Sequence, residues 1–259
     1  DPAPATALKA LPSEWGSSAI HLEWDVQQGS EDLAYFELQV QENGGAWSML
    51  AENINPQQRD FWMLGTPGYT YGFRLRGVDS AGNQEAFTDS AETLTRIMVD
   101  CTPDAYENNG SDNTWTGAAR LEINQSQQHN FCAAQDVDWL SFEATAGQKY
   151  TIKVSPVDAG ASAAVQIIAP DRYAVLMETS AEEMNQAITM EWTAPEDGQY
   201  YLMVRPFDER LTGSATQYAV AVESTTPVSP AVFTCSALFL PLVYGLLKLF
   251  QKTKQGASL

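Results

Sequence analysis

The sequence predicts an all-β protein in which two β-sandwich domains precede one C-terminal transmembrane helix. The second sandwich is expected to be jelly-roll-like. Short runs of alternating apolar and polar residues recur from residue 19 to residue 222, with turn residues between them. A segment of seventeen uncharged, mostly apolar residues, 231–247, then follows near the C-terminus. These two observations separate a β-rich part of the chain from a membrane segment.

Composition and charge narrow the class of protein. The chain has 259 residues, of which 44% are hydrophobic, and its mean hydropathy is −0.26, which is ordinary for a chain that buries a core. Residues 1–230 hold all 33 acidic residues and only 11 of the 14 basic ones, a net charge of −22. Such a surface repels nucleic acid and anionic lipid. It suits solubility, divalent cations or a basic partner.

The first domain is predicted at residues 1–98. Strand patterns cover residues 19–26, 35–40 and 69–78, and Asn43-Gly44-Gly45 turns the chain into a further strand at 47–50. About seven short strands in this length indicate a two-sheet sandwich.

This segment resembles fibronectin type III domains. The resemblance rests on Trp24, Pro67-Gly68 and the run from Tyr71 to Asn83, YGFRLRGVDSAGN. It implies that Tyr71 forms a corner hydrogen bond and that Trp24 fills the core. The implied role is that of a spacer or an adhesive module, but no Arg-Gly-Asp is present to support integrin recognition.

The second domain is predicted at residues 99–223. Turns are expected at Ala146-Gly147 and Asp197-Gly198. Its strand patterns cover residues 118–123, 137–142, 150–154, 164–168, 187–192, 200–204 and 218–222.

This segment resembles bacterial pre-peptidase C-terminal domains. The quoted motifs are DAYE at 104–107, HNFC at 129–132, DVDWLSF at 136–142, AGQKY at 146–150 and APEDGQYY at 194–201. Domains of this family accompany secreted proteases and surface proteins and are not catalytic. The resemblance therefore implies a fold and an extracytoplasmic setting, without chemistry.

The three cysteines, like the charged residues, are divided between the acidic part of the chain and the apolar tail. Cys101 and Cys132 flank one segment of the acidic domain, whereas Cys235 lies in the apolar tail. The even pair suggests a disulfide in an oxidising compartment, with two buried free thiols as the alternative. The resemblance fits a bond that joins the entry loop to the sandwich, and a loop of about 30 residues makes it worth about 3 kcal/mol.

The resemblance also implies a calcium site. Some relatives bind calcium with acids from the entry segment and the Asp-x-Asp turn, which here gives the candidates Asp104, Glu107, Asn109, Asp136 and Asp138. Calcium takes six to eight oxygen ligands, which clustered carboxylates and amides provide. The family's Glu-Pro-Asn-Asp opening stands here as ENNG at 107–110, with one proline and one acid lost. Turn capping by Asp and Asn is the alternative.

The membrane segment is predicted at residues 231–250, after a Pro/Ser/Thr linker at 224–230 and before a short cytoplasmic tail at 251–259. The apolar run is long enough to span about 30 Å of hydrocarbon if Lys248 extends to the interface. A buried core helix is the alternative. Three lysines follow the run and place the C-terminus in the cytoplasm and both sandwiches outside: Lys248, Lys252 and Lys254.

Inside this segment Pro241 is expected to kink the helix. The small residues Ser236, Ala237 and Gly245, with Pro241, are candidates for packing against other membrane helices.

No catalytic motif occurs in the sequence: neither a nucleophile elbow, nor a zinc-protease helix, nor a phosphate-binding or dinucleotide-binding glycine loop. The N-terminus has no signal-peptide pattern, so the chain is either a mature form or the C-terminal portion of a longer one. We therefore expect no enzyme activity. Loop tryptophans such as Trp15, Trp62 and Trp115 suit either partial burial or a sugar- or protein-binding surface.

Three functions remain open at this point. The first is a membrane-anchored extracytoplasmic interaction or structural protein of the cell surface. The second is an accessory single-pass subunit of a larger membrane complex. The third is the non-catalytic C-terminal portion of a secreted or surface hydrolase. The sequence does not identify the ligand, the partner or the oligomeric state.

Overall fold

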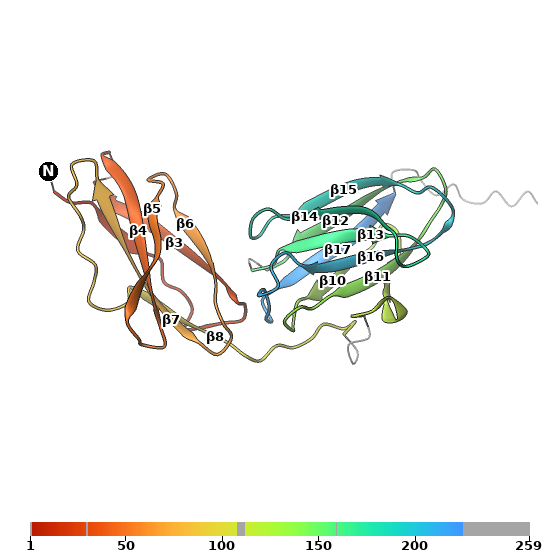
Figure 1. Cartoon of the computed structure of the whole chain (residues 1–259), viewed down its shortest axis with the longest axis horizontal. Helices are drawn as coiled ribbons and strands as arrows, with labels where there is room; N and C mark the ends of the chain where they lie inside the picture. Colours follow the sequence, from red (N-terminus) through yellow and green to blue (C-terminus); the bar gives the residue numbers. More distant parts are fainter. Residues whose placement is uncertain (1, 30, 108–111, 159, 225–259) are drawn as a thin grey trace, which may run out of the picture. The chain divides into compact units, whose positions relative to one another are not determined.

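The structure is a computed structural model that describes residues 2–29, 31–107, 112–158 and 160–224. Within these ranges the chain is all-β apart from one 3₁₀ turn, η1, at Trp115–Gly117 (Figure 1). Strands β1 to β8 form two sheets, and strands β9 to β17 form two others, with no strand shared between the two sets. The predicted all-β fold is confirmed for this part of the chain.

The first sandwich has a three-stranded sheet in the order β1-β3-β6 and a five-stranded sheet in the order β2-β8-β7-β4-β5. Its strands are β1 (Ala5–Leu8), β2 (Glu14–Trp15), β3 (Ala19–Gln28), β4 (Leu33–Glu42), β5 (Trp47–Ile54), β6 (Asp60–Leu64), β7 (Thr70–Asp79) and β8 (Thr93–Ile97).

Alternation builds the core of the first sandwich. In β3, Leu22 and Trp24 are buried and Glu23 is exposed between them, so one face of the strand enters the core. Trp24 meets Phe36 of β4 edge to face, with ring centroids 5.4 Å apart. Tyr71 is buried, and its hydroxyl accepts a hydrogen bond from the backbone N–H of Thr66 at 2.8 Å. The core role of Trp24 and the corner hydrogen bond of Tyr71 are thus both observed.

The predicted hairpin is also observed. Strands β4 and β5 pair antiparallel across the turn, where Asn43 and Gly44 have φ angles of 49° and 70°. Positive φ at both central residues is the geometry that an Asn-Gly pair favours.

The second sandwich has a four-stranded sheet in the order β10-β17-β12-β15 and a five-stranded sheet in the order β14-β13-β16-β11-β9. Its strands are β9 (Ala119–Arg120), β10 (Ser126–Asn130), β11 (Asp138–Ala144), β12 (Lys149–Pro156), β13 (Ala163–Ile168), β14 (Val175–Ser180), β15 (Ile188–Thr193), β16 (Gly198–Pro206) and β17 (Gln217–Ser224).

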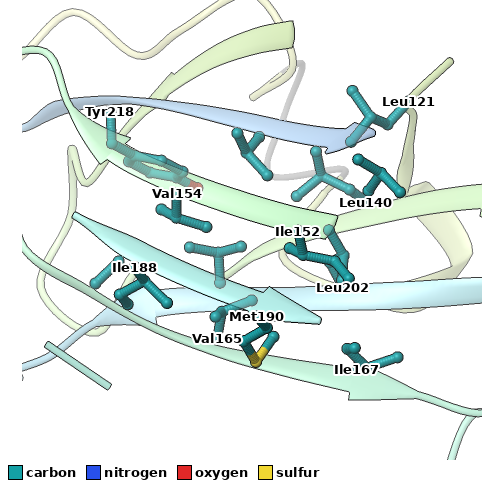
Figure 2. Packing of buried hydrophobic residues seen from close by; sticks show 14 of the residues in the cluster. Leu121, Leu140, Ile152, Val154, Val165, Ile167, Ile188, Met190, Leu202 and Tyr218 are labelled. Atoms are coloured by element: carbon teal, nitrogen blue, oxygen red, sulfur yellow. The ribbon is translucent and has the colours of Figure 1, made fainter. Parts of the chain in front are cut away.

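Side chains from both of these sheets fill the space between them (Figure 2). Ile152 and Val154 of β12 and Val220 of β17 come from one sheet, and Leu140 of β11 and Leu202 of β16 come from the other; each is at most 2% exposed. Strands β12 and β17 again bury every second residue, so one face of their sheet lies against the other sheet.

Two sequence predictions need correction here. The strand expected at 118–123 is reduced to the two-residue β9, because only Ala119 and Arg120 pair with β11 before the chain turns at Ile123 and Asn124. The first domain contains strands that no alternation marked, such as β1 and β6, which are the edges of their sheet.

Candidate metal centre

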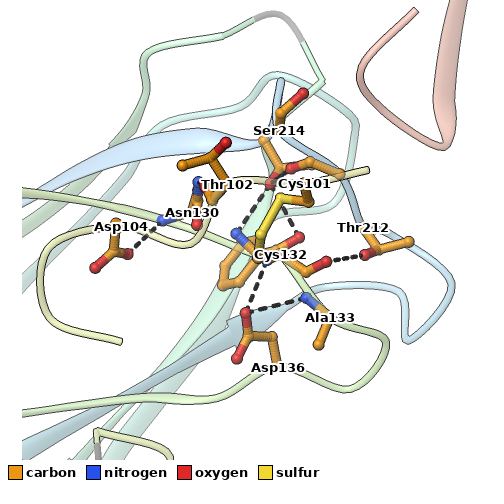
Figure 3. The surroundings of a disulfide bond; sticks show 12 residues. Cys101, Thr102, Asp104, Asn130, Cys132, Ala133, Asp136, Thr212 and Ser214 are labelled. Carbon is orange, nitrogen blue, oxygen red and sulfur yellow. Dashed lines mark hydrogen bonds between the residues drawn. A yellow bond between two sulfur atoms is a disulfide. The ribbon is translucent and has the colours of Figure 1, made fainter. Parts of the chain in front are cut away.

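A disulfide fixes the entry segment of the second sandwich beside the end of β10. Cys101 and Cys132 are bonded, with their Cα atoms 5.5 Å apart (Figure 3). The predicted pairing is confirmed, and free thiols are excluded at these two positions. The bond places residues 102–107 within reach of the turn between β10 and β11.

Asp104 attaches the entry segment to β10. Its Oδ2 accepts a hydrogen bond from the backbone N–H of Asn130 at 2.9 Å, and its Oδ1 accepts one from the N–H of Tyr106 at 2.8 Å. The side-chain amide of Asn130 donates in return to the Thr102 carbonyl at 2.9 Å. Asp104 is therefore held in one orientation by backbone groups on both sides (Figure 3).

Asp136 and Asp138 lie where β11 begins. Asp136 Oδ2 accepts a hydrogen bond from the N–H of Cys132 at 2.8 Å, which caps the turn after the disulfide. Asp138 is fully buried, and its Oδ2 accepts a hydrogen bond from the hydroxyl of Tyr218 on β17. Its Oδ1 has no hydrogen-bond partner among the described residues.

Two further residues complete the cluster. Asp112 is fully buried, and neither of its carboxylate oxygens has a hydrogen-bond partner in the part of the chain that the structure describes. His129, 1% exposed, points Nδ1 at three carboxylates, at 3.6 Å from Asp104, 3.9 Å from Asp112 and 3.9 Å from Asp138. None of these distances is a hydrogen bond.

Burial and mutual repulsion shift the pKa values of this cluster. Burial, followed by the charges of Asp136 and Asp112, raises the pKa of Glu107 to about 7. Burial likewise raises the pKa of Asp112 to about 6 and holds that of Asp138 well above its usual range. Burial lowers the pKa of His129 to about 4, so its ring is neutral near pH 7. The cluster contains no positive charge to balance its carboxylates.

This arrangement fits a divalent cation. Ligand atoms of Glu107, Asp136 and Asp138 all lie within 4.8 Å of one another, and so do those of Asp104, His129 and Asp138. Two oxygens bound to one calcium ion at 2.3–2.6 Å are at most about 5 Å apart, so the first set has calcium-compatible spacing. Buried polar atoms without partners are rare, and an ion between them is one standard explanation.

The structure brings together four of the five residues predicted for calcium: Asp104, Glu107, Asp136 and Asp138. Asn109 lies outside the described residues. Asp112 and His129 were missed as members of the cluster. Asp112 supplies an acid shortly after the ENNG opening that had lost one, and testing acids a few residues further along the chain would have identified it.

The membrane predictions fall outside the described part. Residues 225–259, which include the predicted helix, its packing residues and its three lysines, are not described. Among the residues that are, no helix is long and apolar enough to cross a bilayer.

Comparison with known proteins supports the family resemblance of the second sandwich. Residues 136–206 match the family model for the bacterial pre-peptidase C-terminal domain, which confirms the resemblance over that range. The match includes Asp136 and Asp138 and leaves out the entry segment. No curated protein matches the sequence.

Solved structures are similar at low identity. The pre-peptidase C-terminal domain of a Bacillus anthracis collagenase is 20% identical, with a TM-score of 0.34, and the match covers 40% of this chain and 93% of that one. PliG, a periplasmic lysozyme inhibitor of Aeromonas hydrophila, is 15% identical, with a TM-score of 0.30 and coverage of 40% and 96%. A two-domain fibronectin type III segment of chicken tenascin is 10% identical, with a TM-score of 0.24 and coverage of 86% and 99%. The fibronectin type III assignment of the first sandwich stays a prediction.

Proposed function

We propose that this chain is a non-catalytic, membrane-anchored protein of the cell surface whose second sandwich binds calcium. Its role is interaction or structural support rather than chemistry. The observation that carries the calcium assignment is the set of buried carboxylate oxygens without partners among the described residues, at Asp112 and Asp138. Asp138 groups with Glu107 and Asp136, and the charge of Asp112 acts on Glu107.

The electrostatics favour this assignment. Burying a carboxylate without a partner is costly, and the cluster contains five acids and one neutral histidine. A bound dication offsets that repulsion and supplies the missing partners at the same time. Glu107, Asp112, Asp136 and Asp138 would hold the ion, and Asp104 would anchor the entry segment beside it.

Calcium titration of the full chain tests this assignment. After treatment with a chelator, we expect calcium to bind with one transition and to raise the unfolding temperature. Asp138→Asn should abolish both effects. Glu143→Gln, an exposed change of equal charge on the same strand, should leave them intact. If chelator-treated protein neither binds calcium nor gains stability from it, the carboxylates serve as turn caps and the assignment is wrong.

Anchoring is supported by sequence alone. Residues 231–247 carry no charge, and three lysines follow them while no acid does. We propose that both sandwiches are extracytoplasmic, and the Cys101–Cys132 disulfide fits an oxidising compartment. Loss of residues 227–259 should release the protein from membranes. If the truncated protein stays in the membrane fraction of cells as completely as the full chain does, residues 227–259 are not the anchor.

Two alternatives have specific support. Pro241 and the small residues of the apolar segment suit a helix that packs in a larger complex. The pre-peptidase C-terminal match suits the non-catalytic portion of a hydrolase. Gentle detergent extraction followed by native size separation and mass spectrometry distinguishes them. Stoichiometric membrane subunits would favour the first, and a longer precursor with an enzyme domain would favour the second. Migration alone would direct the search to surface ligands, including carbohydrate.

A further inference from the structure

The hairpin between β13 and β14 exposes an unusual amount of apolar surface. Tyr173 is 83% exposed, Val175 50%, Leu176 40% and Met177 39%. They form four of five consecutive positions at one turn and the strand after it, which is the edge of its sheet. A cluster of this kind on a soluble domain marks a contact surface. We refer to Tyr173, Val175, Leu176 and Met177 as the apolar tip.

The tip lies at the end of the sandwich from which β17 leaves. Ser224, the last residue of β17, accepts a hydrogen bond from the Gln148 side chain at 2.9 Å, and the adjacent Gly147 donates to the Ala194 carbonyl at 2.8 Å. Gly198 follows Ala194 by four residues and begins β16. The ring of Pro170 lies against it, 3.3 Å from the point where a Cβ atom on Gly198 would stand. Pro170 lies between the end of β13 at Ile168 and the start of β14 at Val175.

The chain after Ser224 sets the distance from this end to the apolar segment. Six residues, 225–230, separate it from Ala231. The seven steps from Ser224 to Ala231 span at most about 25 Å when the chain is fully extended. If residues 231–250 cross the bilayer, the end of β17 is tethered within about that distance of the lipid surface, and the apolar tip at the same end of the sandwich is held there at a high effective concentration.

We propose that the apolar tip inserts into the outer lipid interface and orients the second sandwich on the membrane. This inference rests on the proposed membrane anchor. Weak affinity suffices, because the anchor makes insertion intramolecular.

The chemistry of the tip favours apolar insertion over charge attraction. Asp171 and Glu178 flank it, and the one cation of the turn, Arg172, lies over the Trp115 ring, with its guanidinium carbon 4.2 Å from the ring centroid. The contact should therefore form on zwitterionic phosphatidylcholine and be insensitive to salt. Apolar faces at the interface are buried about 5–10 Å into the boundary between headgroups and acyl chains.

The opposite end of the same sandwich provides a matched control. Val157 is 48% exposed, which is similar to the 50% exposure of Val175. It follows the end of β12, where its N–H donates to the carbonyl of Gln217 at the start of β17. It lies at the far end of β17 from Ser224. The full chain with Cys235→Ser accepts a single environment-sensitive dye through either Val175→Cys or Val157→Cys.

The experiment reconstitutes both labelled proteins in phosphatidylcholine vesicles that contain brominated lipid. We expect dye emission at 175 to shift to shorter wavelength and to be quenched by shallow bromines, and the dye at 157 to show neither effect. A vesicle-bound protein whose two dyes both remain in water would overturn the insertion and leave the anchor standing. A shifted but unquenched dye at 175 would assign the tip to a protein contact instead. Failure of either protein to float with vesicles would refute the anchor itself.

Discussion

Replacing Asp112 by asparagine should change stability in opposite directions with and without calcium. Asp112 is fully buried, its two oxygens have no partner among the described residues, and burial raises its pKa from 3.8 to about 6. A shift of about two units corresponds to about 3 kcal/mol at pH 7.5, since one unit is worth 1.36 kcal/mol. Without a cation, this is the cost of keeping the side chain charged.

Asparagine removes the charge at nearly constant volume, and its amide N–H groups have carboxylate acceptors nearby. In chelator at pH 7.5 we therefore expect Asp112→Asn to raise the unfolding temperature, by roughly 6–12 °C for a gain of about 3 kcal/mol. With excess calcium the order should reverse, because the variant lacks one charged ligand and gains less from the ion.

Thermal unfolding followed with and without calcium measures both effects, in the transition that calcium shifts. Glu143→Gln, exposed on β11, controls for net charge and should behave as wild type in both conditions. A variant that is less stable than wild type in chelator, with an unchanged calcium shift, would refute the electrostatic reasoning and remove Asp112 from the site.

Three further predictions concern the second sandwich. Cys132→Ser opens a loop whose ends are 31 residues apart. Denaturant unfolding should show a loss of about 3–4 kcal/mol of stability, and calorimetry should show weaker calcium binding. An unchanged calcium affinity would show that the site does not depend on the disulfide. Tyr150→Phe removes the hydrogen bond that the Tyr150 hydroxyl accepts from the Thr145 N–H at 2.9 Å and should cost about 1 kcal/mol of stability. An unfolding curve in urea that shows no loss of stability would contradict this prediction. In chelator, lowering the pH from 8 to 6.5 should stabilise the protein, because the raised pKa values of Glu107 and Asp112 give stability that is lost as pH rises through about 6–7. His129, whose folded-state pKa is lowered, opposes this only below about pH 6.5, and a flat profile over that interval would contradict the shifts.

The sequence predicted the interior strands better than the edge strands. Strands such as β3, β4 and β12 bury one face, so apolar residues alternate along them and the pattern is visible. The edge strands β10 and β14 show no such alternation, because β10 reads SQQHN and β14 is exposed on both faces. Edge position alone is not the cause, because the edge strand β15 alternates and was predicted at residues 187–192. Such predictions depend on the apolar alternation that β10 and β14 lack.

The metal cluster was predicted in part, for a comparable reason. The acids of the entry segment and of the Asp-x-Asp turn could be assigned by resemblance, and the structure brings four of them together. His129 has no carboxylate partner in the local sequence, because its three acidic neighbours come from residues 104, 112 and 138. Contacts between distant segments bring them together: the Asn130 N–H donates to Asp104, the Tyr218 hydroxyl of β17 donates to Asp138, and the Trp139 N–H donates to the Asp112 carbonyl.

The disulfide also determines how the second sandwich would carry mechanical load. A pull between the first sandwich and the C-terminal end enters at Cys101 and crosses directly to Cys132, because the two residues are covalently joined. Residues 102–131, which include β9 and β10, therefore lie outside the covalent path of that tension. Asp104, Glu107, Asp112 and His129 belong to this bypassed segment, so a pull along the chain reaches them only through the hydrogen bonds that hold the segment to the sandwich, such as the pairing of β10 with β17.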